Sequence, residues 1–258
     1  MKTIGIISGK GGVGKTTVSI NLAYSLSKFN KKVCLVDLNL TTPHVSTMLS
    51  LNYDKNLTDY LKNRATELES IYPYMNFWIM PASLKLESLE DITINSLHSL
   101  KRDLGHFEFL VLDSAPGFGK EGLFPLFLAD ELLIVSEPTY SSLIDTLKAK
   151  QIAEKLGRNI SGIILNKVTK GRLNRKDFEE VTKLLVIETI ELSKSFHKAE
   201  TNRIPVASID KKIEEKFDNI ARKLLGLKME KNVGFFDVRR FFRFFRKNKN
   251  IEILNNLK

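Results

Sequence analysis

A glycine-rich loop near the start of the chain places the strongest constraint on its fold. Residues 9–17 read Gly-Lys-Gly-Gly-Val-Gly-Lys-Thr-Thr, which satisfies the pattern G-x-x-x-x-G-K-[ST]. The loop follows a short apolar run, Thr3–Ser8, and precedes an amphipathic stretch over residues 15–29. Glycines let the backbone wrap closely around a phosphate with its N–H groups pointing inward, and the start of a helix adds a positive dipole. We therefore expect a strand, a phosphate-binding loop and a helix in succession.

Apolar and amphipathic segments alternate along the rest of the chain. Short apolar runs predict strands over Thr3–Ser8, Lys32–Asp37, Asn76–Met80, Phe107–Asp113, Glu131–Ser136 and Ile160–Asn166. Helical patterns occupy residues 15–29, 87–103, 120–129, 141–156, 175–184 and 208–226. This alternation predicts an α/β fold with three layers, in which a mostly parallel central sheet carries helices on both faces.

The order of segments also predicts how the chain is divided. We expect one P-loop NTPase domain over residues 1–226 and a short linker over 227–233. An amphipathic helix over 234–247 and a flexible tail over 248–258 would follow.

Bulk properties exclude several other classes of protein. No run approaches the roughly eighteen apolar residues that are needed to cross a bilayer. Cys34 is the only cysteine, which excludes disulfides within the chain and Cys-pair metal or iron–sulfur sites built by one chain alone. A cytoplasmic protein is the simplest expectation.

The residue types of the loop predict how it would hold a nucleotide. Lys15 is expected to reach the β- and γ-phosphate oxygens, Thr16 to offer its hydroxyl to Mg²⁺, and Thr17 to lie near the α-phosphate. The competing interpretation is a glycine turn without a ligand, which the lysine, the threonines and the strand–helix context all disfavour. The loop residues expected around the phosphates are Gly11, Gly12, Val13, Gly14, Lys15, Thr16 and Thr17.

Two predicted strands end in a carboxylate, at Asp37 and at Asp113. Ligands of such sheets lie outside the carboxyl ends of the strands, so both aspartates are expected to face the nucleotide. For one aspartate alone, a helix cap or a turn would explain the residue equally well. Two of them behind a phosphate loop favour a role at the site.

With Lys10 included, the loop reads K-G-G-x-G-K-[ST], and here the sequence resembles the deviant Walker A ATPases of the MinD and ParA family. The resemblance covers residues 2–226 and is closest to archaeal-type, MinD-like ATPases that position cell division. It implies ATP and Mg²⁺ as ligands and an ATP-dependent homodimer. It also implies that Lys10 reaches the phosphates bound by the partner, whereas elsewhere a solvated loop lysine would be the ordinary interpretation.

The same resemblance assigns roles to residues outside the loop. Asp113, followed by Ser-Ala-Pro-Gly, resembles Walker B and switch II, so that it would hold the Mg²⁺ shell while Gly117 senses the γ-phosphate. Asp37 resembles the first aspartate of switch I, near a metal-bound water. Asn166 resembles the asparagine that reads adenine, although asparagine at a strand end is also an ordinary turn residue. The segment 203–206 resembles the late loop that closes over the base.

Switch I departs from the pattern of many relatives, which read Asp-x-Asp. This chain reads Asp37-Leu38-Asn39, and an asparagine can orient a water molecule but cannot accept its proton. The residues expected to contribute to catalysis are Lys10, Lys15, Asp37 and Asn39. We therefore expect ATP binding with slow hydrolysis that a partner stimulates.

The end of the chain is basic and rich in phenylalanine. Residues 231–258 carry +6 of the net charge of +10 and six of the sixteen Phe. At helical spacing over 234–247, one half of the surface is apolar and aromatic, and it holds Phe235, Val238, Phe241, Phe242 and Phe245. The other half is basic and holds Arg239, Arg240, Arg243, Arg246 and Lys247.

This pattern is typical of a helix that lies in a membrane interface. Docking of the Phe stripe on the body and binding of nucleic acid are the alternatives, with DNA less favoured because the first 230 residues are nearly neutral.

The function that these observations favour is an ATP-dependent, dimerising molecular switch of the MinD type. It would cycle between the cytoplasm and the inner face of the cell membrane, and would position cell-division or other machinery through an unidentified partner or activator. A ParA-like ATPase that partitions DNA or cargo is the alternative, together with a regulator of flagellum or pilus placement.

Overall fold

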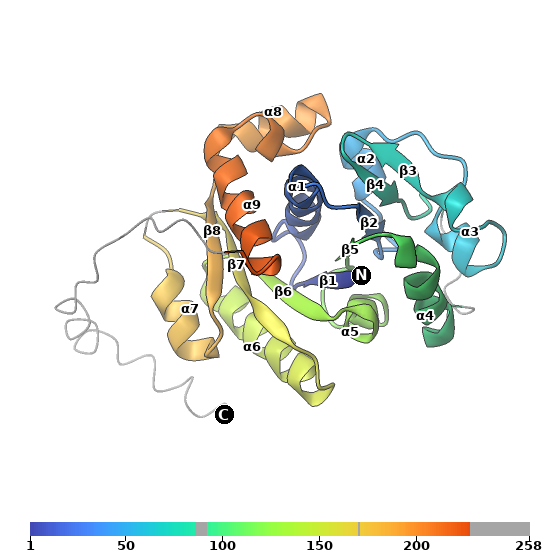
Figure 1. Ribbon diagram of the computed structural model, residues 1–258. Coiled ribbons are helices and arrows are strands. Elements are labelled where there is room, and N and C mark those ends of the chain that lie inside the picture. The colour runs from blue at the N-terminus through green and yellow to red at the C-terminus, as the bar shows by residue number, and fades with distance from the viewer. Residues whose placement is uncertain (86–91, 170, 228–258) are drawn as a thin grey trace.

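A central sheet of eight strands organises the protein, as the computed structural model in Figure 1 shows. The structure describes residues 1–85, 92–169 and 171–227. The strand order is β3-β4-β2-β5-β1-β6-β7-β8, and every neighbouring pair is parallel except β3 with β4. The strands are β1 (Lys2–Ile7), β2 (Val33–Asp37), β3 (Tyr72–Tyr74), β4 (Phe77–Met80), β5 (Phe109–Asp113), β6 (Glu131–Ser136), β7 (Ile160–Val168) and β8 (Val186–Glu191). The predicted α/β class with a mostly parallel sheet is confirmed.

Helices cover both faces of this sheet (Figure 1). The α-helices are α1 (Lys15–Lys28), α2 (Val45–Leu49), α3 (Leu57–Leu61), α4 (Ile94–Asp103), α5 (Phe124–Leu128), α6 (Tyr140–Lys155), α7 (Arg175–Thr182), α8 (Lys194–Asn202) and α9 (Lys211–Leu224). Short 3₁₀ turns are η1 (Leu68–Ser70), η2 (Leu104–His106), η3 (Glu121–Leu123) and η4 (Val206–Ser208). In the part of the chain that the structure describes, no helix is both long enough and apolar enough to cross a bilayer.

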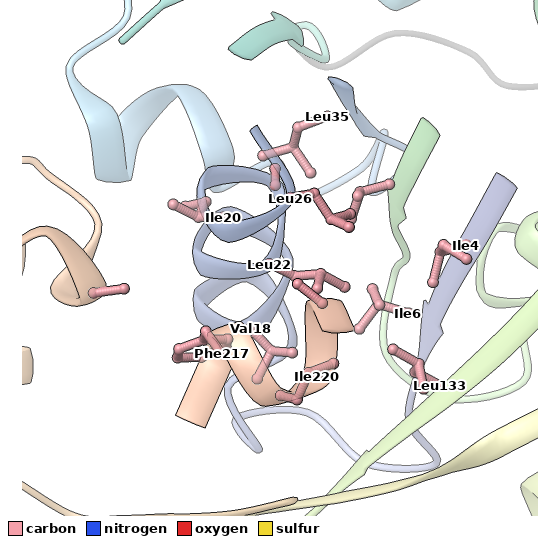
Figure 2. Packing of buried hydrophobic residues seen from close by; sticks show 14 of the residues in the cluster. Ile4, Ile6, Val18, Ile20, Leu22, Leu26, Leu35, Leu133, Phe217 and Ile220 are labelled. Atoms are coloured by element: carbon pink, nitrogen blue, oxygen red, sulfur yellow. The ribbon is translucent and has the colours of Figure 1, made fainter. Parts of the chain in front are cut away.

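Successive residues of the central strands pack into different layers of the core. Ile4 and Ile6 of β1 lie in the cluster that joins the sheet to α1 and α9, and Figure 2 shows them together with Val18 and Phe217 of this cluster. Ile7 packs on the opposite face. A parallel sheet buried on both faces needs continuous apolar strands, and the burial of every residue of β2 and β5 fits this requirement.

The predicted elements agree with the structure where the sequence is strongly patterned. All six predicted strands are present, with shifts of one or two residues at some ends. The helix predicted over 87–103 begins at Ile94, and residues 86–91 lie outside the described part. The stretch 120–129 divides into η3 and α5, because Pro125 occupies the first turn of a new helix.

Apart from short 3₁₀ turns, five elements of the described part were not predicted, namely β3, β8, α2, α3 and α8. Three of them, β3, α2 and α3, have only three to five residues, which is too short for a period to show. β3 also contains Pro73, which is tolerated because this strand lies at an edge of the sheet. The division into a domain over 1–226 and the segments after it stays a prediction, since residues 228–258 lie outside the described part.

Candidate functional site

The glycine-rich loop lies at the carboxyl end of β1 and leads directly into α1. Gly12 and Gly14 adopt left-handed backbone conformations with φ of 78° and 91°, which other residues adopt only with strain. A Cβ added to Gly14 would lie 2.3 Å from Asn166 Nδ2, so glycine is also required for close approach. The predicted succession of strand, loop and helix is present.

The two lysines of the loop occupy opposite environments. Lys15 is 7% exposed, and its Nζ donates a hydrogen bond to Ser8 Oγ at 3.0 Å. Burial lowers the pKa of Lys15, while the charge of Asp113 raises it. Lys10 is exposed, and its ammonium has no hydrogen-bond or ion-pair partner among the residues that the structure describes. Lys15 is therefore fixed within the loop, whereas Lys10 is available to a group outside the chain.

The predicted aspartates lie side by side, because Asp37 of β2 is in register with Asp113 of β5. Both are 0% exposed. Asp113 accepts hydrogen bonds from Thr16 Oγ1 at 2.7 Å and from Ser19 Oγ at 2.8 Å. Asp37 accepts from the backbone N–H groups of Asn39 and Val45, at 3.1 and 3.2 Å.

Burial raises the pKa of Asp37 well above its ordinary value, and the charge of Asp113 adds to this effect. Burial also raises the pKa of Asp113. The hydrogen bonds from Thr16 and Ser19 and the charge of Lys15 lower this pKa, but burial has the larger effect. A divalent cation would favour the ionised form of both carboxylates. The chemistry of these groups fits a magnesium nucleotide, because Mg²⁺ binds through one or two carboxylates, waters and phosphate oxygens. Clusters of three or more His, Cys, Asp or Glu that could hold a metal by themselves do not occur in the described residues.

Asn39 is engaged within its own loop. Its Nδ2 donates to the carbonyl of Thr42, and its Oδ1 accepts from Thr42 Oγ1 at 3.1 Å. Both ends of the amide thus close a turn in this conformation. The water-orienting role of Asn39 stays a prediction that requires the turn to open.

A clasp formed by Thr41 and Glu121 joins the two segments that resemble switches. The backbone N–H of Thr41 donates to Glu121 Oε2 at 3.0 Å, and its hydroxyl donates to Oε1. Nearby, the N–H of Gly117 donates to the carbonyl of Ser8 at 3.0 Å, with Gly117 at φ of 76°. The segment after Asp113 therefore contacts the phosphate loop at one end and the loop after Asp37 at the other.

Two residues at the end of β7 contact the phosphate loop from its far side. Asn166 Nδ2 donates to the carbonyl of Val13 at 2.8 Å. Lys167 Nζ donates to the carbonyl of Gly12 at 2.5 Å and pairs with Glu137 at 3.0 Å. Asn166 is thus beside the phosphate loop with its donor directed at the backbone, and its role in reading adenine stays a prediction.

A largely apolar pocket adjoins the last threonine of the loop. Its walls come from α1, α2, α8 and the segment 204–206, and they include Thr17, Met48, Phe196 and Pro205. Over one rim, Arg203 donates from its guanidinium to the carbonyl of Thr47. The segment predicted to close over a base is therefore beside the phosphate loop.

Sequence patterns did not point to Ser19, Glu121 or Lys167. Ser19 is three residues after Thr16 on a helix, a spacing at which a second hydroxyl can reach the same carboxylate. Glu121 and Lys167 bond to residues that are 80 and 155 positions away, for which local spacing gives no signal.

The fold and this site define a P-loop nucleoside triphosphatase of the deviant Walker A type. Residues 1–225 match the ParA family model, whose description is NUBPL iron-transfer P-loop NTPase. The chain belongs to this family.

Three similar proteins illustrate its place there. The ATP-binding protein MJ0547 of Methanocaldococcus jannaschii is 32% identical over 88% of this chain and 89% of its own length. The cell division ATPase MinD of Pyrococcus furiosus has a similar structure, with a TM-score of 0.82, 27% identity, and coverage of 88% of this chain and 99% of that one. The septum site-determining protein MinD of Pyrococcus horikoshii, solved with Mg-ADP, has a TM-score of 0.80 and 26% identity over 86% of this chain and 95% of that one.

Proposed function

We propose that the protein is an ATP-dependent, dimerising switch of the MinD type that binds a membrane in its ATP state. The observation that carries the proposal is the contrast between its two loop lysines. Lys15 is buried and held by Ser8, while Lys10 is exposed without a partner among the described residues. One chain therefore offers Lys15 to a nucleotide in its own loop and Lys10 to a group of another molecule.

Within one chain, the loop would hold the phosphates of ATP. The N–H groups of residues 11–17 would surround the phosphate oxygens, Lys15 would neutralise the β- and γ-phosphates, and Thr17 would lie near the α-phosphate. Thr16 and Asp113, already hydrogen-bonded to each other, would hold Mg²⁺ and its waters together with Asp37. Bound Mg²⁺ supplies charge neutralisation on the transferring phosphoryl group. The pocket next to Thr17 offers apolar walls to the base.

Lys10 would act across a dimer of two copies. A cation that reaches the γ-phosphate of the partner stabilises the charge that develops during transfer. It also makes the dimer depend on that phosphate. Hydrolysis would be slow without an activator, because the amide of Asn39 cannot accept a proton and is bonded to Thr42. Gly117, which contacts Ser8, would transmit loss of the γ-phosphate to switch II.

The membrane step rests on the sequence of residues 234–247, outside the described part. Each Phe of the apolar half contributes roughly 1.5–3 kcal/mol when buried. Each cation near an anionic leaflet adds about 1 kcal/mol. The cost of ordering the segment offsets much of this gain, so one copy would bind weakly and two would bind by avidity. The dimer would then position cell-division or other machinery through a partner protein.

Co-sedimentation with liposomes tests the proposal. Full-length protein and a chain stopped at residue 231 are mixed with phosphatidylglycerol-rich or neutral phosphatidylcholine vesicles, in ATP or in ADP. We expect sedimentation only of the full-length protein, with ATP and anionic lipid, and loss of it in Lys10→Ala although ADP still binds. Equal sedimentation in ATP and ADP, or none at all, would contradict the membrane switch. Strong ATP-dependent binding of DNA would favour a ParA-like function instead.

A further inference from the structure

The phosphate loop is held from its outer side by consecutive residues of β7. Asn166 and Lys167 donate to the carbonyls of Val13 and Gly12, which are themselves consecutive. Lys167 is in turn paired with Glu137, which follows the end of β6. A chain of contacts thus leads from the neighbouring strand ends to the backbone of the loop.

The direction of those carbonyls decides whether the loop can bind an anion. Each peptide unit places its N–H and its C=O on opposite sides, so a loop that turns N–H groups toward a phosphate must turn its carbonyls away from it. A peptide that flips would present a carbonyl oxygen to the phosphate and repel it. Gly12 and Gly14 have no Cβ to resist such a flip. A donor on the outer side of Gly12 resists it instead.

We propose that Lys167, held by Glu137, is a positioning residue of the phosphate site, which acts through the carbonyl of Gly12. This inference rests on the proposed binding of a nucleotide by the loop. Lys167 would act without touching the phosphates, since its Nζ bonds to the Gly12 carbonyl and pairs with Glu137. It fixes the backbone that touches them, and its positive charge lies on the outer side of the loop.

The geometry of Lys167 separates this role from that of a simple surface ion pair. A surface pair contributes little and needs no particular backbone. Lys167 adopts φ of 55°, in the left-handed region that non-glycine residues rarely occupy. Its Nζ satisfies a carboxylate and a loop carbonyl together, although the side chain is 41% exposed.

The test uses full-length protein and titrates Mg-ADP and magnesium pyrophosphate separately by calorimetry. Lys167→Met keeps the aliphatic stem and removes the donor, Lys167→Arg restores one, and Glu137→Gln weakens the tether. Lys101→Met is a matched control, because Lys101 also donates to a carbonyl and a carboxylate, those of Leu128 and Asp130, at 3.0 and 2.6 Å. This pair precedes β6, at the amino ends of the strands.

We expect Lys167→Met to weaken both ligands by the same factor, roughly five- to tenfold, which is the scale of a partly exposed charged hydrogen bond. Lys167→Arg should recover most of the affinity, Glu137→Gln should lose about two- to threefold, and Lys101→Met should bind like wild type. Weakening of ADP with unchanged pyrophosphate would overturn the proposal, since Lys167 would then act on the nucleoside. Unchanged binding of both ligands would overturn it as well.

Two further measurements keep the result interpretable. Thermal unfolding of each unliganded variant shows whether it is folded. If Lys167→Met is not folded, Glu137→Gln replaces it in the test. Equal weakening of ADP and pyrophosphate in Glu137→Gln would support the proposal, and weakening of ADP alone would overturn it. Failure of the proposed function looks different: wild-type protein would bind neither ligand, or Lys15→Ala would bind both like wild type.

Discussion

Replacing Ser19 by alanine should destabilise the unliganded protein through the loss of one hydrogen bond to Asp113. The hydroxyl of Ser19 lies 2.8 Å from Asp113 Oδ1, and both residues are 0% exposed, so water cannot replace it. A hydrogen bond to a charged group contributes about 1.5–3 kcal/mol. Alanine recovers roughly 0.5 kcal/mol of helix propensity. The expected net loss is about 1–2.5 kcal/mol, or about 2–10 °C in Tm for a chain of this size.

Ser25 provides the matched control, because it is on the same helix and is also 0% exposed, yet its Oγ has no hydrogen-bond partner in the described part. Ser25→Ala should be neutral or stabilising by up to about 1 kcal/mol, since it removes a buried hydroxyl that nothing satisfies. The difference between the two variants cancels most of the helix propensity. Urea unfolding, followed by the fluorescence of the single tryptophan Trp78, measures both.

The pH dependence of the same variant gives a second readout. Burial raises the pKa of Asp113 above its ordinary value, and the hydrogen bond from Ser19 opposes this rise. A carboxyl whose pKa is raised on folding favours the folded state at low pH and loses that contribution as the pH rises through its folded pKa. Ser19→Ala raises the pKa further, so its destabilisation should grow as the pH rises through the folded pKa of Asp113. Equal losses in the Ser19 and Ser25 variants, or a loss that does not grow with pH, would refute the reasoning.

Three other predictions follow from the site. Gly14→Ala should weaken Mg-ADP binding at least about tenfold by calorimetry. The added Cβ would lie 2.3 Å from Asn166 Nδ2 and would displace it, and alanine adopts the φ of 91° at this position only with strain. Glu121→Gln, which weakens the clasp to Thr41, should change stability by less than about 1 kcal/mol but speed proteolysis within residues 38–44; unchanged cleavage would mean that the clasp does not hold the loop. Asp37→Asn should raise the Tm of the magnesium-free protein at about pH 8 and flatten its pH dependence, because the raised pKa of Asp37 makes ionisation unfavourable in the folded state; a lower Tm would contradict this.

The sequence predicted the parts of the fold and site that depend on local pattern. The apolar runs before Asp37 and Asp113 indicated buried parallel strands, and the rule that such strands end at one edge placed both carboxylates together. The loop motif located Lys15 and Thr16 because it directly follows the first strand of the chain and begins the first helix. These features need only spacing and residue type.

The remaining features depend on contacts between distant segments. Ser19 meets Asp113 across 94 positions and Lys167 meets Gly12 across 155, distances at which an isolated serine or lysine carries no pattern. The turn that occupies the amide of Asn39 depends on the backbone conformation that brings the hydroxyl of Thr42 to it, and residue type alone does not give that conformation. The neighbours of these residues are set by the order of strands in the sheet, which the sequence pattern does not give.

The last described helix, α9, ends beside the amino end of β1, at the opposite end of that strand from the phosphate loop. The carbonyl of Leu224, at the end of α9, accepts a hydrogen bond from Lys2 Nζ at 2.8 Å, and Lys2 begins β1 while the loop follows the other end of that strand. Six residues of strand span about 20 Å, roughly twice the distance over which salt screens a charge. Between solvent-exposed groups, the charge of a γ-phosphate would be largely screened at that distance. α9 packs against α1, whose first turn holds Lys15, so this pair of helices joins the phosphate loop to the opposite end of the sheet through continuous packing.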